Sequence, residues 1–231
     1  MPDPVTARSA QPLAVIFDFD DTLANSLPAR VAALQRCLSD HLARPVSAVE
    51  ATQTINSAPY IDDQLRWLLG EDPAIPSLVQ AYRHHYYHPE RAPLEAFEGV
   101  RDALSALERQ RVSLALVTSR YRTGAAGNPQ WSVVHELERM GLSKYFTAIV
   151  GFEDTEGHKP SPEPFLLGCR LLGVAPARVL AVGDTPFDIA GARDAGAVSA
   201  AALWGTADPS ALLAASPDVV LAAPSEVLVH L

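Results

Sequence analysis

Lysine is scarce in this sequence: Lys144 and Lys159 are the only two, and the other sixteen of its 18 basic residues are arginines. Because arginine serves wherever a general positive charge is enough, each lysine is a candidate for a task that needs a compact ammonium group. Cysteine is equally rare. Cys37 and Cys169 both lie in apolar, helix-like surroundings, so we expect two small core residues in a reducing compartment rather than a disulfide.

Long hydrophobic runs are also absent, because no stretch of eighteen apolar residues exists. Residues 1–11 lack the apolar segment of a signal peptide, so we expect a loose tail and a cytoplasmic protein without a membrane partner. The net charge of −9 argues against a nucleic-acid partner, since such proteins present a basic face. It allows a small phosphorylated metabolite, because a bound cation can reverse the local field. The absence of Gly-rich phosphate loops argues against a P-loop kinase.

What is present is an alternation of strands and helices. Apolar runs occur at residues 13–17, 112–117, 147–150, 179–183 and 198–203, and helical patterns separate them from residue 95 onward. This order predicts an α/β core (12–23 and 95–231), a Rossmann-like parallel sheet with helices on both faces. Residues 24–94 show helical periodicity and no convincing strand, so we expect a small all-α domain inserted into the core.

Polar side chains follow the predicted strands, at the point where each strand ends. Because the carboxyl ends of parallel strands form one rim where ligands bind, these side chains should gather there. Those that we expect at this rim are Asp18, Asp20, Thr118, Ser119, Arg120, Asp184, Asp188 and, from the loop before a helix, Lys159.

This set of residues predicts phosphoryl-transfer chemistry. Crowded carboxylates from Asp18, Asp20 and Asp184 repel one another, and a hard cation with oxygen ligands, Mg²⁺ above all, would reduce that repulsion. Asp18 can attack phosphorus to give an aspartyl-phosphate, and Asp20 can supply a proton to the leaving group and later take one from water. The candidates for binding the phosphate oxygens are Thr118, Ser119 and Lys159.

Four stretches of the chain, in order, are DFDDTLANS, LVTSR, HKPSPEPF and VGDTPFDIAGARDAG. They resemble the four motifs of the haloacid dehalogenase-like phosphohydrolases, and the helical block is similar to that family's α-helical cap. The resemblance covers about residues 13–231. It implies Asp18 as nucleophile, Asp20 as acid/base, and Thr118 and Lys159 as phosphate ligands. The metal ligands that it implies are Asp18, Asp20 through its backbone carbonyl, and Asp184, with Asp188 in or beside the metal site.

The chain departs from the family pattern in the first motif, where Asp21 replaces the usual Gly and Asn25 the usual Asp. Asp21 adds a charge beside the site or lies on the far side of the turn. Taken singly, Asp21 and Asp188 fit turn or N-cap residues as well as site residues.

The loop after the second motif, RYRTGAAGNPQW, is several residues longer than is usual in the family. Asn128 and Pro129 fit an N-cap and the first residue of the next helix. Either Arg120 or Arg122 could reach the site from this loop, but we favour a solvated loop.

Two enzymatic interpretations remain open. A cap lysine, which the family's carbon–phosphorus-cleaving members need, is missing, and the presence of Asp20 disfavours dehalogenases. The favoured interpretation is hydrolysis of small phosphomonoesters, as in phosphoglycolate phosphatase-like members, and the other is a phosphomutase of the β-phosphoglucomutase type. A phosphate-binding regulator without turnover is the least favoured. The substrate depends on cap residues, for which Tyr60, Arg66, His84 and His85 are candidates, and the sequence predicts no particular oligomeric state.

Overall fold

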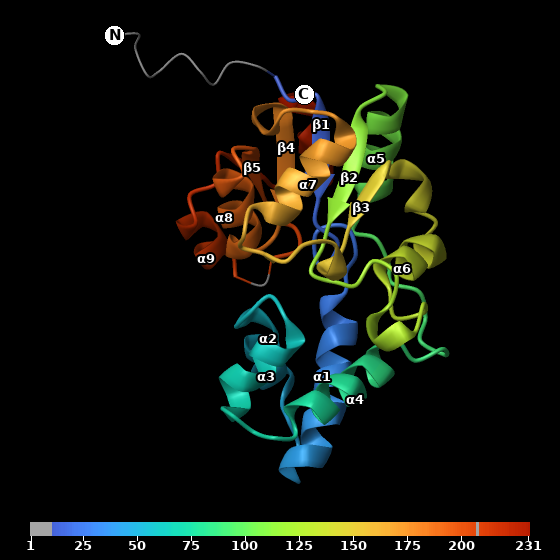
Figure 1. The fold of residues 1–231 in the computed structure, drawn as a ribbon, viewed down its shortest axis with the longest axis vertical. Helices are drawn as coiled ribbons and strands as arrows, with labels where there is room; N and C mark the ends of the chain where they lie inside the picture. The colour runs from blue at the N-terminus through green and yellow to red at the C-terminus, as the bar shows by residue number, and fades with distance from the viewer. Residues whose placement is uncertain (1–10, 207) are drawn as a thin grey trace.

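A six-stranded parallel sheet forms the centre of the computed structural model, which describes residues 11–206 and 208–231. The expected tail, residues 1–11, lies outside this range except for Gln11. The strand order is β3-β2-β1-β4-β5-β6, and each neighbouring pair is parallel. Figure 1 labels the strands β1 to β5 of this sheet. The strands are β1 (Ala14–Phe17), β2 (Ser113–Val117), β3 (Ala148–Val150), β4 (Val179–Gly183), β5 (Val198–Ala202) and β6 (Val219–Leu221). The predicted α/β fold is therefore confirmed.

Helices cover both faces of the sheet, because its strands are apolar on both sides. In β1, Val15 and Phe17 join the apolar cluster on one face, whereas Ala14 and Ile16 join the cluster on the other. The first face is covered by α5 (Val100–Arg109) and α6 (Val133–Met140), and the second by α7 (Glu163–Leu172) and α8 (Pro186–Asp194). A short helix, α9 (Pro209–Ala214), packs beside α8 through Leu212 and Ile189. Short 3₁₀ turns lie at Ala125–Gly127, Ser143–Tyr145, Phe152–Asp154, Pro176–Arg178 and Pro224–His230.

Four helices inserted between β1 and α5 build an apolar cluster of their own. These cap helices are α1 (Leu27–Leu42), α2 (Ala48–Asn56), α3 (Ile61–Leu69) and α4 (Ile75–Tyr86). Their shared cluster includes Leu34 and Leu38 of α1, Ile55 of α2, Leu65 of α3 and Leu78 of α4. The cap helices lie beyond the carboxyl ends of the strands (Figure 1). The molecule therefore faces the predicted rim with an all-helical layer.

The two cysteines occupy different parts of this architecture. Cys37 belongs to the cluster of the cap helices and Cys169 to one face of the sheet, and both are free and buried. The expectation of two core thiols without a disulfide is confirmed.

The start of α6 differs from the prediction. Asn128 and Pro129 do not begin the helix, because Asn128 Oδ1 accepts a hydrogen bond from the backbone of Gln130 and closes a turn. The N-cap is Ser132, whose hydroxyl accepts from the His135 N–H. Ser132, four residues after Asn128, accepts the hydrogen bond of the first helical turn instead. The loop before α6 is therefore longer than predicted.

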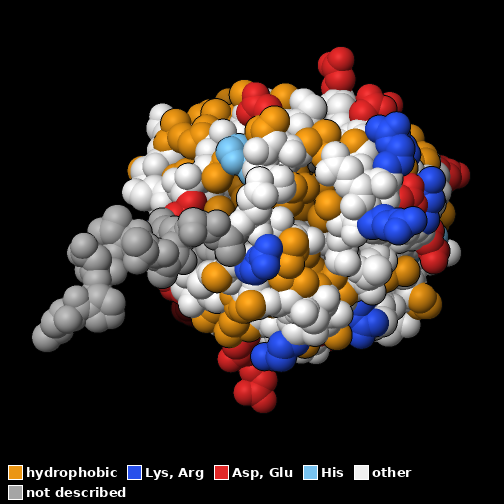
Figure 2. Space-filling view, turned by 90° about the horizontal axis from the view of Figure 1, so that it is seen from above, with side chains coloured by type: hydrophobic (Ala, Val, Ile, Leu, Met, Phe, Trp, Pro, Cys, Tyr) orange, Lys and Arg blue, Asp and Glu red, His pale blue; other side chains and the backbone are white. Residues whose placement is uncertain are grey.

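Figure 2 looks at the end of the core opposite the cap helices, where Lys and Arg side chains lie among acidic and apolar ones. No helix within residues 11–206 and 208–231 combines the length and apolar character needed to cross a bilayer.

Candidate active site

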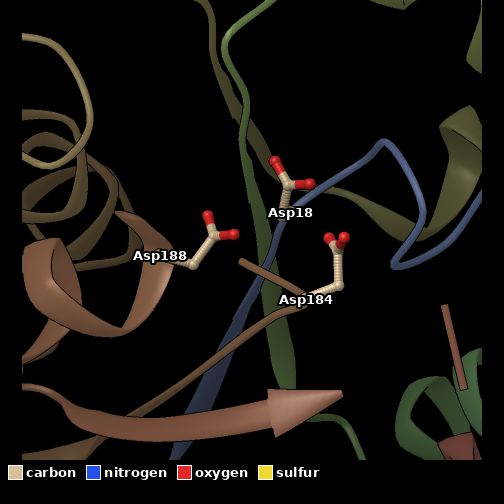
Figure 3. A group of neighbouring side chains, drawn as sticks. All are labelled: Asp18, Asp184 and Asp188. Atoms are coloured by element: carbon tan, nitrogen blue, oxygen red, sulfur yellow. The ribbon is translucent and has the colours of Figure 1, made fainter. Parts of the chain in front are cut away.

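Three carboxylates meet at the carboxyl end of the sheet. Asp18 directly follows β1, Asp184 directly follows β4, and Asp188 lies in the first turn of α8. Figure 3 shows the three side chains pointing toward a common space, and one ligand oxygen of each lies within 4.8 Å of the others. The predicted convergence of these residues therefore occurs, although their sequence separation exceeds 160 residues between Asp18 and Asp184.

Local hydrogen bonds fix two of these carboxylates. Asp184 Oδ1 accepts from the Thr22 hydroxyl at 2.8 Å. Asp188 Oδ2 accepts from the Thr185 hydroxyl at 2.5 Å and from the Thr185 N–H at 3.2 Å, while Thr185 caps α8 in return. Gly183 makes room for this arrangement, because a Cβ there would lie 2.3 Å from the Cβ of Asp188. The capping box and the glycine together hold Asp188 against the end of β4.

Lys159 is the cation of this group. Its Nζ donates to Asp18 Oδ1 and to Asp188 Oδ1, each at 2.6 Å, and the side chain is buried. Its two anionic neighbours raise the pKa of Lys159 even though burial alone would lower it. The ammonium therefore stays charged and joins two of the three carboxylates.

One ammonium does not balance three buried carboxylates. Burial is the main reason that the pKa of Asp18 rises to about 7; Lys159 opposes the rise, and Asp188 and Asp20 add to it. Burial, together with Asp18 and Asp188, also raises the pKa of Asp184 well above its ordinary value. This excess of negative charge, on oxygen ligands that converge, fits a hard divalent cation.

The carboxylate of Asp20 lies apart from this group and is paired with Arg120. Arg120 Nε donates to Asp20 Oδ2 and Nη2 to Asp20 Oδ1, both at 2.5 Å. Burial alone would raise the pKa of Asp20, but Arg120 lowers it to about 2. Arg120 also donates to the hydroxyls of Tyr86 and Tyr87 at the end of α4, at 2.6 and 3.0 Å.

The expectation of a solvated loop is therefore wrong for Arg120, whose side chain is only 11% exposed. A carboxylate and two tyrosine hydroxyls supply the partners that a buried guanidinium needs. The sequence signal that could have revealed the burial of Arg120 is its position, because Arg120 follows Thr118 and Ser119 at the same strand end. Arg122 behaves differently: it is partly exposed and pairs with Asp154 at 2.8 and 2.9 Å.

Asp21 lies beside the acidic group, where its charge helps to raise the pKa of Asp184, but its own carboxylate is bound at the start of α1. It adopts a left-handed backbone conformation with φ of 57°, which a glycine would adopt without strain. Its Oδ1 accepts from the N–H groups of Ser26 and Leu27 at the start of α1, and its Oδ2 pairs with Arg30 at 3.0 Å. Asp21 therefore has a turn and helix-capping role, and it also adds a charge beside the site.

The two remaining predicted residues lie at the end of β2. Thr118 is buried, donates its N–H to Val150 O and accepts at Oγ1 from the Arg120 N–H. Ser119 is half-buried beside the acidic group and contacts the Tyr60 hydroxyl. Of these two residues, Ser119 lines the cavity in front of Asp18, and Thr118 does not.

Two cavities meet at this rim. The smaller, of about 170 Å³, is lined by Asp18, Ser119, Lys159, Asp184 and Asp188, among others. The larger, of about 400 Å³, lies between α3, α4 and the loop after β2. Asp20 and Ser119 line both cavities, so the acidic group connects with a space under the cap helices.

Of the cap residues that the sequence suggested, Tyr60 and Arg66 line the larger cavity. His84 and His85 do not, because α4 turns them toward its other side, where His85 borders a separate surface groove. The sequence analysis missed Arg83, which does line the cavity.

Comparison with known proteins agrees with this geometry. The family model for haloacid dehalogenase-like hydrolases matches residues 15–202. A protein named "putative pyrophosphatase PpaX" from Caldanaerobacter subterraneus subsp. tengcongensis is 31% identical over 209 residues, which cover 89% of this chain and 88% of the relative. Phosphoglycolate phosphatase from Salmonella paratyphi A is 31% identical over 228 residues, with coverage of 89% and 87%.

A solved structure shows the same fold. The Thermotoga maritima protein described as a "putative beta-phosphoglucomutase" superposes with a TM-score of 0.71 at 26% identity, over 93% of this chain and 96% of that one. The chain belongs to the haloacid dehalogenase-like hydrolases, as its four motifs predict.

Proposed function

We propose that this chain is a Mg²⁺-dependent phosphatase that hydrolyses small phosphomonoesters through an aspartyl-phosphate on Asp18. The observation that carries the proposal is the meeting of Asp18, Asp184, Asp188 and the Lys159 ammonium at one end of the sheet, beside a cavity large enough for a small ester. Relatives named phosphoglycolate phosphatase and pyrophosphatase support phosphorus chemistry at this site.

The metal ligands that we propose are the side chains of Asp18, Asp184 and Asp188 and the backbone carbonyl of Asp20. When bound, Mg²⁺ would neutralise the carboxylates and withdraw charge from the phosphate oxygens. Thr22 and Thr185 hold Asp184 and Asp188 in place through hydrogen bonds, so the fold orients these two ligands before a metal binds.

In the first half-reaction, a carboxylate oxygen of Asp18 attacks phosphorus. The new bond joins that oxygen to phosphorus, the bond from phosphorus to the alcohol oxygen breaks, and Asp20 gives its proton to the leaving oxygen. The residues that would bind the phosphoryl oxygens as their charge shifts are Thr118, Ser119 and Lys159. Lys159 already contacts Asp18, so its ammonium would lie close to a phosphate that Asp18 attacks.

In the second half-reaction, water attacks the phosphorus of the aspartyl-phosphate. Asp20 takes a proton from that water, the bond between phosphorus and Asp18 breaks, and inorganic phosphate leaves with Asp18 regenerated.

The Asp20–Arg120 pair constrains this cycle. Both oxygens of Asp20 accept hydrogen bonds from Arg120, so the arrangement favours the charged, proton-accepting form. Asp20 must leave Arg120 before it can carry a proton to an alcohol. Because Arg120 also holds Tyr86 and Tyr87, a shift of the cap helices is the movement that would open the pair.

We propose that residues 24–94 form a cap domain over a core of residues 12–23 and 95–231. Support comes from the separate apolar cluster of the cap helices and from the larger cavity between these helices and the core. The cap would then select the alcohol part of the ester while the core performs the chemistry.

A second candidate is a phosphomutase of the β-phosphoglucomutase type, favoured by the likeness to the Thermotoga maritima protein. Such an enzyme shares the first half-reaction but returns the phosphoryl group to a sugar instead of water. Closure of the cap against water would favour it.

Release of inorganic phosphate tests the proposal. The panel contains 2-phosphoglycolate, pyrophosphate, sugar phosphates and aryl phosphates, each with Mg²⁺ and with EDTA, and Asp18→Asn is the blank. Metal-dependent release that the variant loses is the expected result. Release that survives in Asp18→Asn would overturn the nucleophile, and conversion of glucose 1-phosphate to glucose 6-phosphate without release would favour the mutase.

A further inference from the structure

The larger cavity is unusually rich in tyrosine. Five of the chain's six tyrosines line it: Tyr60, Tyr82, Tyr86, Tyr87 and Tyr121. They come from the start of α3, from α4 and its end, and from the loop after β2, so separate parts of the chain direct them to one space. A tyrosine offers a flat apolar face and a polar tip, which suits a ligand with a ring body and polar substituents.

Four arginines also line this cavity, but three of them are neutralised by the chain itself. Arg30 pairs with Asp21, Arg66 with Asp62 and Asp63, and Arg120 with Asp20. Each of these three guanidiniums already has a carboxylate partner within the chain.

Arg83 is the exception. Across residues 11–206 and 208–231, no carboxylate lies within ion-pair distance of it, and its guanidinium lies 5.4 Å from the centre of the Tyr121 ring. The side chain is half-buried at the cavity wall. A half-buried guanidinium stacked on a ring keeps its fork of donors for a planar anion.

Resting on the phosphatase function above, we propose that the substrate is a phosphomonoester whose alcohol part is a ring that carries a second anionic group. The ring lies against the tyrosines and the anion is bound by Arg83. The cavity begins at Asp20, the residue that would protonate the alcohol oxygen, so an alcohol leaving the core site enters it directly.

The volume sets a lower limit on this alcohol. A cavity of about 400 Å³ falls in the range of sites for ring-containing small molecules, whereas a two-carbon acid such as glycolate would leave most of it empty. The tyrosine faces would then have nothing to contact. The proposal therefore separates this chain from enzymes that prefer the smallest phosphorylated acids.

Matched pairs of esters test it. Phenyl phosphate is compared with 4-carboxyphenyl phosphate, and glucose 1-phosphate with glucuronic acid 1-phosphate, so that each pair differs in one carboxylate on the same ring. We expect kcat/KM to be at least about tenfold higher for the carboxylated member of one pair, as a charge-assisted hydrogen bond provides. The pair that responds distinguishes an aromatic from a sugar ring.

Arg83→Gln should lower kcat/KM for the carboxylated ester by about tenfold to a hundredfold, mainly through KM, and change its uncharged partner less than about threefold. Arg36→Gln, an exposed cap arginine beside a different groove, should leave both esters unchanged. A carboxylate preference that persists in Arg83→Gln, or turnover of 2-phosphoglycolate more efficient than that of every ring ester, would overturn the inference.

A binding measurement keeps this inference separate from the proposed function. Calorimetric titration measures binding without turnover. The two proteins compared are Asp18→Asn and the double variant Asp18→Asn, Arg83→Gln, and each is titrated with 4-carboxyphenyl phosphate and with glucuronic acid 1-phosphate. Binding that weakens at least about tenfold without Arg83 supports the inference even if no ester is hydrolysed, which would overturn only the phosphatase. Equal Kd values in the two proteins for both esters would overturn the inference alone.

Discussion

The candidate active site has two sides that differ in composition. The core side is formed by the residues at the carboxyl ends of the strands, and the cap side is formed by the residues around the larger cavity. On the core side, charged groups are locked to one another: Lys159 joins Asp18 and Asp188, and Asp184 is held by Thr22. On the cap side, tyrosine rings and Arg83, which has no carboxylate partner among residues 11–206 and 208–231, surround a larger space. The rigid charged side suits a reaction that is the same for every phosphate ester, and the aromatic side suits selection among alcohols. Changes on the core side should therefore abolish turnover, whereas changes on the cap side should redistribute it.

The largest effect is expected from Asp18→Asn on the core side. Asparagine keeps the size of the side chain but cannot attack phosphorus, so kcat should fall at least about a thousandfold. The fold should remain, because the substitution removes one charge from a group with too many. Steady-state phosphate release and circular dichroism measure the two properties. Activity within tenfold of the original protein would mean that another residue is the nucleophile.

The next largest effect is expected from Lys159→Arg. Nζ lies 2.6 Å from both Asp18 and Asp188 in a buried site, and a longer, planar guanidinium cannot occupy that point. We expect kcat to fall about a hundredfold although the charge is kept.

The chain supplies a matched control for this substitution. Lys144, the only other lysine, is exposed with its ammonium over the Tyr145 ring, and Lys144→Arg should leave kcat unchanged. If both variants lose activity equally, the loss reflects the replacement of lysine in general and not the site.

The core side is also the part that the sequence predicts well. Asp18, Thr118 and Asp184 follow apolar runs directly, and strand ends of a parallel sheet converge whatever the details of packing. The order of strands and helices therefore predicts the location of these three residues, and no individual side-chain contact has to be known. Asp188 and Lys159 follow from the same rule, one helical turn or one loop away.

The cap side could not be predicted in this way. Whether Arg83 or His84 faces the cavity depends on the rotation of α4 against α1, and neighbouring residues on a helix point about 100° apart. The partners of Arg120 are equally hidden, because Tyr86 and Tyr87 come from another domain-sized segment of the chain. The predicted start of α6 was wrong for a local reason, since both Asn128 and Ser132 are good capping residues.

Metal and pH should act together on the stability of the core side. The pKa of Asp18 is about 7 in the folded chain against an ordinary value of 3.8, so the folded state binds more protons between about pH 4 and 7. The free energy of unfolding in EDTA should therefore fall as pH rises through that window, by an amount on the order of 4 kcal/mol. Mg²⁺ should oppose the fall, because it binds the ionised carboxylates of the folded chain.

Denaturant unfolding at pH 5 and pH 8, with EDTA and with Mg²⁺, measures this effect. Asp18→Asn is the control, since without this carboxyl group the decline in EDTA should be smaller. The pairing of Asp20 with Arg120 has the opposite sign: the pKa of Asp20 is lowered to about 2, so its contribution is present above about pH 4 and is lost only in stronger acid. Stability in EDTA that rises between pH 5 and pH 8 would contradict the charge excess at the site.

The smallest effect is expected on the cap side, from Tyr60→Phe. The Tyr60 ring packs on Phe152 and His158 with centroid distances of 5.2 and 5.4 Å, and phenylalanine keeps these contacts. The contacts of its hydroxyl with Ser119 and with the Lys159 backbone are lost, so KM should rise about threefold with kcat nearly unchanged. His84→Ala, an exposed change outside the cavity, should alter neither constant. A fall in kcat for Tyr60→Phe as large as that for Lys159→Arg would mean that the cap takes part in the chemistry, and the division between the two sides would not hold.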